Sequence, residues 1–275
     1  MSDVREPDRE AQRLSFGAFA ATYDAARPEW PAPTARWLTG TEDGGPLRPS
    51  RPPTPTSGRD GRRLRVADVG AGTGKLTRAL VAAGHEVVAV DPDPGMLAVL
   101  RGAVPGTPTF IGTGEQLPLP DASVDAVTVA QAWHWFDGWA ASQEIARVLR
   151  PGGVLGVAWH VRDESVPWVR ELTMLTHRAP GPAEPPTPMP GPPMFDAGEQ
   201  ATFRHDQRVT VEELVTLASS WSYVAMRADR DEVLAGVAAL GERVLAAEGS
   251  IVVPHDTRCF RYVRPASSMP GDREG

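Results

Sequence analysis

The sequence predicts an α/β protein built on a doubly wound, mostly parallel sheet. Between about residues 63 and 177, short apolar runs alternate with segments of helical periodicity. A glycine-rich loop joins the first of these runs to the first helical segment. Because a strand, a helix and a second strand form a right-handed crossover, this alternation favours parallel strands with helices packed on the sheet.

Each element of this central region has its own justification. Apolar runs that end at turn residues predict strands at Leu64–Val69, Glu86–Val90, Thr109–Ile111, Val124–Ala130 and Val154–Trp159. Helical spacing predicts helices at Gly74–Ala83, Pro94–Arg101 and Asp137–Leu149. Gly84 suits the position after the first helix, Pro94 suits the start of the second, and Pro151-Gly152-Gly153 stops the third.

The pattern changes after residue 194. Strands are expected at Thr202–Arg204 and Thr257–Val263, and helices at Thr210–Ser219 and Asp229–Glu248. The first of these helices opens with a Thr-Val-Glu-Glu capping box at residues 210–213, in which the first and last side chains satisfy each other's backbone amides.

Two proline-rich tracts divide the chain. Residues 46–56 hold five prolines and residues 178–193 hold eight. Since proline lacks an amide donor, neither tract suits a helix or a central strand, and both are expected to be exposed connections. A polyproline ligand for a partner protein is the alternative interpretation.

The composition limits the function classes. Lys+Arg 28 against Asp+Glu 35 give a net charge of −7 and a pI near 5.4, which argues against a general binder of nucleic acid or of anionic membranes. No apolar run approaches the roughly 18 residues of a membrane span, and the charged N-terminal residues lack a signal-peptide pattern. Cys259 is the single cysteine, so no internal disulfide can form. We therefore expect a globular cytoplasmic protein.

The glycine-rich loop points to a cofactor. Gly70, Gly72 and Gly74 follow a strand and open a helix, where a backbone without side chains can approach a ligand beside a donor-rich helix start. Lys75 stands where the dinucleotide fingerprint needs its third glycine, which weakens a nicotinamide-cofactor reading. A tight strand–helix turn without a ligand is the structural alternative.

Residues at the ends of the next two strands extend this candidate site. Asp91 lies where a doubly wound sheet binds the two hydroxyls of a ribose, which would serve any adenosine cofactor. Met96 can cover a purine face or pack in the core. After the third strand, Gly114 and Glu115 lie in a turn that can offer backbone amides and one carboxylate to an adenine edge.

Four motifs resemble those of class I S-adenosylmethionine-dependent methyltransferases. They are VADVGAGTGKL, VVAVDPDPGML, TGEQLPLPDASVDAVTVAQAWHWFD and ARVLRPGGVL. The runs FGAFAATYDAARPEWP, AQAWHWFD and WHVRDESVPWVREL are similar, more narrowly, to the trans-aconitate methyltransferase-like group. The resemblance implies a Rossmann-like, seven-stranded sheet with an N-terminal helical lid and proline-rich loop insertions.

The resemblance also implies one methyltransferase domain over residues 1–275. Its expected parts are a helical cap at 11–40, a cofactor-binding core at 63–177, C-terminal strands and substrate-side helices at 194–265, and flexible loops at 41–62 and 178–193. The residues that would bind S-adenosylmethionine are Tyr23, Arg27, Asp68, Gly70, Gly72, Gly74, Asp91, Pro92, Met96, Gly114, Glu115, Ala130 and Gln131. The chain departs from the family at Gly114, where alanine is more usual, and at His160, where asparagine is usual.

His134 is the candidate general base. It lies between Trp133 and Trp135 after the fourth strand, and an imidazole among indoles would be desolvated and therefore neutral. A packing role for His134 is the alternative. The residues expected to bind the acceptor are Trp133, His160, Arg162, Trp221 and Tyr223. Arg162 can instead form a structural ion pair with Asp163.

The sequence thus favours methyl transfer to a small molecule. We expect O-methylation in secondary metabolism, by in-line displacement without a metal, in a monomer or homodimer with no nucleic-acid or membrane partner. The aromatic acceptor residues favour a mostly apolar or aromatic molecule with one polar handle. Two alternatives stay open: a cofactor-binding protein of this fold that does not transfer methyl groups, and, less favoured, an NAD(P)-dependent oxidoreductase.

Overall fold

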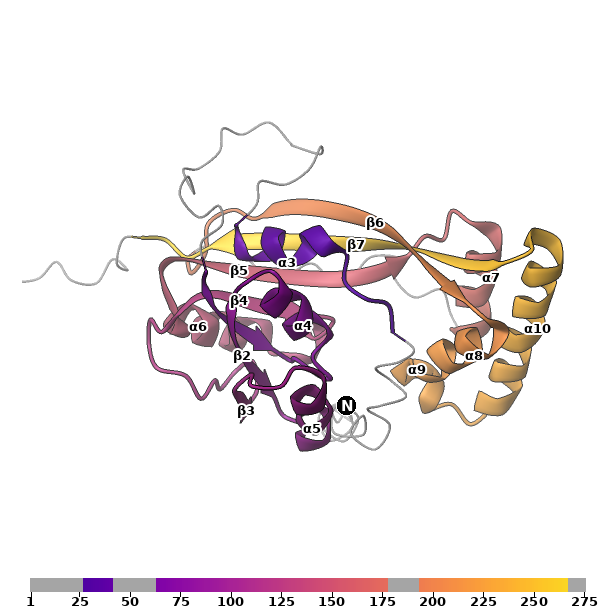
Figure 1. Ribbon diagram of the computed structural model, residues 1–275, viewed down its shortest axis with the longest axis horizontal. Coiled ribbons are helices and arrows are strands. Elements are labelled where there is room, and N and C mark those ends of the chain that lie inside the picture. Colours follow the sequence, from indigo (N-terminus) through magenta and orange to yellow (C-terminus); the bar gives the residue numbers. More distant parts are fainter. Residues whose placement is uncertain (1–26, 42–62, 178–192, 267–275) are drawn as a thin grey trace, which may run out of the picture. The chain divides into compact units, whose positions relative to one another are not determined.

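A seven-stranded sheet forms the frame of the structure, a computed structural model that describes residues 27–41, 63–177 and 193–266. Its strands lie in the order β3-β2-β1-β4-β5-β7-β6, with helices beside them (Figure 1). The predicted α/β fold with a doubly wound, mostly parallel sheet of seven strands is confirmed.

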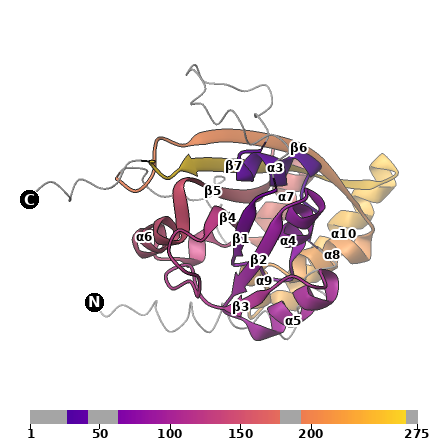
Figure 2. The ribbon, with the colours of Figure 1, turned by 60° about the vertical axis from the view of Figure 1, so that its left-hand side comes forward.

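Five strands make up the parallel part of the sheet. They are β1 Arg65–Val69, β2 Glu86–Asp91, β3 Thr109–Ile111, β4 Val124–Ala130 and β5 Leu149–Arg162. The crossover helices are α4 Lys75–Ala82, α5 Pro94–Ala103 and α6 Gly138–Val148, and Figure 2 shows α4 and α6 on opposite sides of these strands. Because β1 pairs in parallel with β2 and β4, and β2 with β3, the loops that follow these strands meet at one edge of the sheet.

The remaining strands, β6 Glu199–Val209 and β7 Ile251–Val263, complete the sheet. β7 runs antiparallel to β5. The amide of Gly152 donates to the carbonyl of Arg264 at 3.0 Å, while at the other ends of these strands the amide of Asp163 donates to the carbonyl of Pro254 at 3.0 Å. The sheet is therefore mixed: β3, β2, β1, β4 and β5 form its parallel part, which carries the glycine loop, and β7 and β6 follow.

The chain divides into two compact units, and each is described by itself. The sheet unit comprises Trp30–Trp159, Pro186–Phe203 and Arg258–Gly275. The helix unit comprises Met1–Glu29, His160–Pro185 and Arg204–Thr257. Strands β5, β6 and β7 contribute residues to both units.

The sheet unit has its own apolar core. The helix α3 Ala32–Thr39 packs there with α4 and with strands β1 and β4. Leu38, Val66 and Leu80 in this cluster are fully buried. Gly156 permits the close approach of α3, because a Cβ atom at this position would lie only 2.5 Å from the carbonyl oxygen of Leu38.

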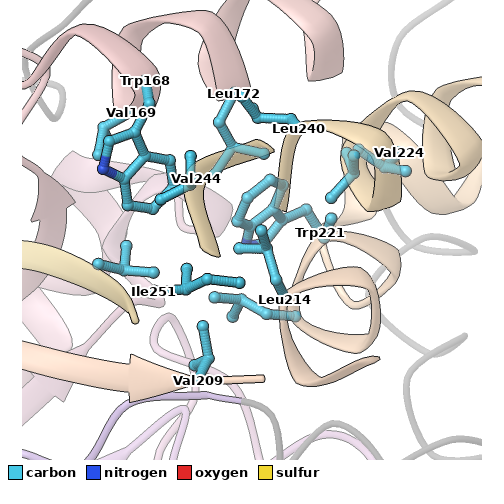
Figure 3. Close-up of a cluster of buried hydrophobic side chains, with 14 of the residues drawn as sticks. Trp168, Val169, Leu172, Val209, Leu214, Trp221, Val224, Leu240, Val244 and Ile251 are labelled. Carbon is cyan, nitrogen blue, oxygen red and sulfur yellow. The ribbon is translucent and has the colours of Figure 1, made fainter. Parts of the chain in front are cut away.

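The helix unit has a second core, drawn in Figure 3. Its helices are α7 Pro167–Thr176, α8 Val211–Ser219, α9 Ser222–Ala225 and α10 Arg230–Glu248. Leu172, Leu214 and Trp221 lie in the centre of this cluster and are at most 4% exposed. The capping box expected at the start of α8 is present: Thr210 Oγ1 accepts from the Glu213 amide at 3.1 Å, and Glu213 Oε2 accepts from the Thr210 amide at 2.8 Å.

Several boundaries differ from the sequence expectation. The sequence analysis assigned no helix to Pro167–Thr176, where α7 forms. β5 begins at Leu149 rather than at Val154, because Gly152 and Gly153 exchange backbone hydrogen bonds with Arg264 instead of leaving the sheet. β6 and β7 are also longer than expected.

Some expectations fall outside the described residues. These are the tract 46–56, nearly all of the tract 178–193, residues 11–26 of the predicted cap, and Tyr23. Among the described residues, no helix has both the length and the apolar composition that crossing a membrane requires.

Candidate functional site

The glycine loop between β1 and α4 adopts a backbone that side chains would strain. Gly70, Gly72 and Gly74 have φ angles of 68°, 55° and 90°. A Cβ atom at Gly70 would lie 2.5 Å from that of Ala132, and one at Gly74 would lie 2.6 Å from Leu100 Cγ. A Cβ at Gly72 would meet nothing within 4 Å, so this glycine marks the open side of the loop.

Asp91 joins the end of β2 to the glycine loop. Its Oδ2 accepts from the Gly72 amide at 2.8 Å and its Oδ1 from the Asp93 amide at 2.9 Å. A carboxylate has about four lone-pair sites, so Asp91 is of a type that can accept several hydrogen bonds at once. Asp93 instead caps α5, since its Oδ1 accepts from the amides of Gly95 and Met96.

Asp68 lies at the end of β1 and is buried. Its oxygens accept hydrogen bonds from the hydroxyls of Thr77, at 2.6 Å, and Thr128, at 3.0 Å. Burial raises the pKa of Asp68 to about 6, and the negative charge of Asp91 adds to this, while the two hydroxyls act in the opposite direction. The carboxyl group is therefore poised to become more acidic if a cation binds beside it.

The loop after β3 is shaped by an aromatic ring. A Cβ atom at Gly114 would lie 2.6–2.8 Å from the Phe136 ring, which gives a steric reason for glycine at a position where the family usually has alanine. Glu115 Oε1 accepts from the Asp137 amide at 2.8 Å, and this ties the loop to the start of α6. Met96 is 5% exposed and so offers little surface to a ligand.

The end of β4 carries a strained residue. Gln131 has a φ of 56°, which is uncommon for a residue other than glycine. Its amide donates to the carbonyl of Ala158 at 2.9 Å, so the hydrogen bonding of the sheet holds this conformation. Strain of this kind clusters at functional sites, and here it directly follows Ala130 at the strand end where the sequence placed the cofactor.

These residues fit an adenosine cofactor that carries a cation. The open side of the glycine loop leaves room for a ligand at Gly72, and Asp91 beside it offers acceptors for ribose hydroxyls. Asp68 supplies a carboxyl group whose ionisation a cation would favour. Among the described residues, no group of histidine, cysteine and acidic side chains is arranged to hold a metal ion.

The aromatic segment after β4 differs in part from the expectation. Trp133 is 5% exposed and meets Phe136 edge to face at 5.9 Å, so it packs in the core. His134 is exposed, with its ring 4.9 Å from that of Trp135. The expected desolvation of His134 is wrong, because the short helix over residues 133–135 turns Trp133 inward and His134 outward.

In the helix unit, Arg162 does not form the ion pair with Asp163 that the sequence left open. Asp163 pairs with Arg204 instead. The Arg162 guanidinium lies 4.1 Å from the centre of the Trp221 ring. Trp221 is 4% exposed and belongs to the core. The sequence predicted that Trp221 contacts the acceptor directly, whereas in the structure its ring packs against the guanidinium of Arg162.

His160 belongs to a cluster that the sequence analysis missed. Its Nδ1 lies 2.9 Å from Thr257 Oγ1, which lies 3.3 Å from His205 Nδ1. His205 stacks on His255 with 5.2 Å between ring centroids. The i, i+2 spacing of His255 and Thr257 in the sequence indicates that they share one face of a strand. Their contact with His160 and His205 depends on the pairing of β5, β7 and β6, which the sequence does not indicate.

Arg27 belongs to the same unit. Its Nη2 donates to the carbonyl of Ser220 at 3.1 Å. The described candidate residues therefore fall into two groups. The sheet unit holds Trp133, His134 and the described cofactor residues other than Arg27, and the helix unit holds Arg27, His160, Arg162, Trp221 and Tyr223.

Comparison with known proteins gives a consistent result. Residues 67–157 match the model of a methyltransferase domain. An uncharacterised methyltransferase of Mycobacterium tuberculosis is 40% identical over 257 residues, which cover 92% of this chain and 97% of the relative. An uncharacterised methyltransferase-like protein of Schizosaccharomyces pombe is 33% identical over 76% of this chain and 78% of its own. The solved structure of a putative type II methyltransferase from Anaeromyxobacter dehalogenans is similar with a TM-score of 0.63 and 25% identity, over 86% of this chain and 97% of that one.

Proposed function

Because the chain belongs to the class I S-adenosylmethionine-dependent methyltransferase family, we propose that it methylates a small-molecule acceptor, with oxygen the favoured acceptor atom. S-adenosylmethionine is the cofactor of this family. The observation that carries the proposal is the glycine loop, with its open side at Gly72 and the Asp91 carboxylate hydrogen-bonded to the same residue.

The sheet unit would hold the cofactor. Asp91 would accept the ribose hydroxyls, and Asp68 would stabilise the positive charge of the amino acid end. Gly114 and Glu115 would border the adenine. The other sheet-unit members of the proposed cofactor set are Gly70, Gly74, Pro92, Met96, Ala130 and Gln131. The set also includes Tyr23, and Arg27 of the helix unit.

The cofactor, when bound, supplies an electrophilic methyl group on a positively charged sulfur. The protein's part is to align the acceptor with that group and to exclude water. A hydroxyl acceptor also needs a group that takes its proton, and His134 is the proposed base, with an exposed imidazole able to reach solvent. Neither task requires a metal ion.

A two-stage experiment tests the proposal. Calorimetry with S-adenosylmethionine first measures binding, and the protein with radiolabelled cofactor is then incubated with a metabolite extract. We expect label in a small-molecule fraction, and alkali-labile or ether-type products would report transfer to oxygen. Binding without any transfer would favour the alternative of a non-methylating cofactor protein, and absence of binding would reject both.

A further inference from the structure

The Arg162 guanidinium packs beside a row of aromatic side chains in the helix unit. Its guanidinium carbon is 4.1 Å from the centre of the Trp221 ring, a cation–π distance. Trp221 stacks on Tyr223 with 5.7 Å between the ring centroids, and the Tyr223 ring lies 4.1 Å from that of His177 at a tilt of 31°. Since Trp221 is part of the buried core, the position of the guanidinium is fixed by packing.

The guanidinium meets only weak polar partners. Its terminal nitrogens lie 3.4–3.5 Å from the hydroxyls of Tyr223 and Thr173, which is long for a hydrogen bond. Its Nε is buried and has no hydrogen-bond partner in the described structure. Arginine has five N–H donors in a planar fork that matches carboxylate and phosphate oxygens. The donor capacity of Arg162 is therefore largely unused.

No carboxylate neutralises Arg162 within the described parts of the chain. The adjacent Asp163 pairs with Arg204. Glu164 instead accepts a hydrogen bond from the Thr173 hydroxyl at 2.9 Å. A half-buried cation without an anion is unfavourable, and a bound anion would remove that cost.

The charge of Arg162 acts on His177. Burial lowers the pKa of this histidine first, and the positive charges of Arg162 and Arg227 lower it further. The carbonyl of Thr173 and the charge of Glu164 act in the opposite direction but do not cancel the effect. The space around His177 is therefore electropositive.

The same charge acts on His255. Burial lowers the pKa of His255 to about 3, together with His205 and the positive charges of Arg162 and Arg27. Its Nδ1 lies 3.0 Å from the carbonyl of Val253, so Nδ1 carries the proton of the neutral ring. The positive charge of Arg162 thus adds to the effect of burial at two histidines on different elements.

We propose that Arg162 binds an oxyanion of a small molecule, a carboxylate or a phosphate ester. This inference concerns the helix unit alone and goes beyond the proposed function. The fork of Arg162 supplies the bidentate contact, and Tyr223, which is 38% exposed, offers ring surface beside it.

The wild-type protein provides the first test. NMR of the imidazole C–H signals gives the pKa of His177 alone and with benzoate, phenyl phosphate or benzyl alcohol. The anions should raise the pKa of His177, since they neutralise Arg162, and benzyl alcohol should leave it unchanged. The anion that binds more tightly identifies a carboxylate or a phosphate as the natural group.

Variants provide the second test. Arg162→Gln should weaken benzoate binding in calorimetry about tenfold or more, the effect of removing a charge-assisted bidentate contact. The benzoate affinity of Arg162→Lys should lie between those of wild type and Arg162→Gln, because lysine keeps the charge but lacks the planar fork of donors. Arg243→Gln removes an exposed arginine of the same unit that is already paired with Glu171, and it should bind within about twofold of wild type.

The outcomes test this site independently of the proposed function. An unchanged His177 pKa with both anions, or full benzoate affinity in Arg162→Gln, overturns the oxyanion site. If Arg162→Gln does not fold, the wild-type titration decides. Neither result depends on methyl transfer, which the experiment with labelled S-adenosylmethionine and a metabolite extract tests separately.

Discussion

Asp68 and Asp91 end neighbouring parallel strands, yet their carboxylates have different partners. Asp91 accepts from the backbone amides of Gly72 and Asp93. Asp68 accepts from the hydroxyls of Thr77 and Thr128 in a buried site, and burial raises its pKa to about 6. Asp91 therefore holds the backbone of the loop, while the ionisation of Asp68 responds to the charge of whatever binds beside it.

Replacing Asp91 tests its proposed role in cofactor binding. Asp91→Ala should weaken S-adenosylmethionine binding by about 1–3 kcal/mol, the scale for leaving hydroxyl groups without a charged acceptor. Calorimetry measures the change. Asp93→Ala is the matched control, since it removes the cap of α5 and should lower stability by about 1 kcal/mol with little loss of affinity. Equal affinity losses in both variants would assign the effect to the loop and not to the ribose.

The raised pKa of Asp68 predicts a pH-dependent stability. In the unfolded chain this carboxyl ionises near pH 3.8, and in the folded protein near 6. The folded state binds this proton more tightly than the unfolded chain does. The contribution of Asp68 to stability is therefore most favourable at low pH and is lost between about pH 4 and 6. Above pH 6 the ionised, buried Asp68 lowers the free energy of unfolding by up to about 3 kcal/mol.

Asp68→Asn removes that titration. The cofactor-free variant should gain stability relative to wild type at pH 7.5 in urea unfolding, and the gain should shrink toward pH 4.5. The exposed Asp196→Asn is the control and should show no such trend. A variant that is equally destabilised at both pH values would mean that the two threonine hydroxyls matter more than the burial of the charge.

His134 tests the nature of the chemical step at the scale of one residue. If it takes the proton of a hydroxyl acceptor, His134→Ala should lower turnover by about 10²–10⁴ and leave cofactor affinity intact. If alignment alone drives transfer, the loss should be much smaller. His85→Ala controls for histidine removal in the same unit, since His85 is buried beside Thr39 and Leu64 in the sheet-unit core. Turnover that falls equally in both variants would indicate structural damage.

At the scale of elements, the loops after β3 and β4 are fitted to each other through Gly114 and Phe136. Gly114→Ala should lower stability by about 1–3 kcal/mol, the range for overpacking, because the new methyl group would meet the ring. Phe136→Leu should relieve part of that cost, so the double variant should be more stable than the sum of the single effects predicts. Urea unfolding of the four proteins gives the coupling energy, and strict additivity would show that the ring is not the obstacle.

The elements that the sequence predicted well are those with strong local patterns. The apolar strand Val124–Ala130 and the helix capped by Thr210 have the expected bounds to within one residue. The helix at Pro167–Thr176, which the sequence expectation lacks, also has a local pattern, with Pro167 at its start and Trp168, Val169 and Leu172 on one face. β6 lacked such evidence: it is an edge strand with only alternate side chains partly buried, and its sequence is mostly polar.

The candidate site divides in the same way. The cofactor side follows from residues that are close in sequence to strand ends, so Gly70, Gly72 and Asp91 could be named in advance. The partners of Arg162 and His160 could not. Whether Arg162 pairs with Asp163 or lies on Trp221 depends on how distant segments pack, and a single sequence does not contain that information.

At the scale of the whole molecule, separate apolar clusters support two chemical tasks. In the sheet unit, Ala71 of the glycine loop packs against a buried cluster of Ala89, Leu97 and Leu100. The core of the helix unit includes Trp221, which supports Arg162. Regions with their own buried clusters often open as separate cooperative units. We therefore expect the cofactor residues and the proposed oxyanion site to respond to different perturbations.

Hydrogen exchange measures this independence. Leu214→Ala and Leu80→Ala each remove a fully buried side chain, from the helix-unit core and the sheet-unit core, and each should cost about 2–5 kcal/mol locally. The first should accelerate exchange of the α8 and α10 amides and spare β1 and β2, while the second should do the reverse. S-adenosylmethionine should slow exchange in the glycine loop of both variants. If either substitution accelerates exchange evenly in all these elements, the units unfold together, because β5, β6 and β7 run through both and would then carry the cooperativity from one core to the other.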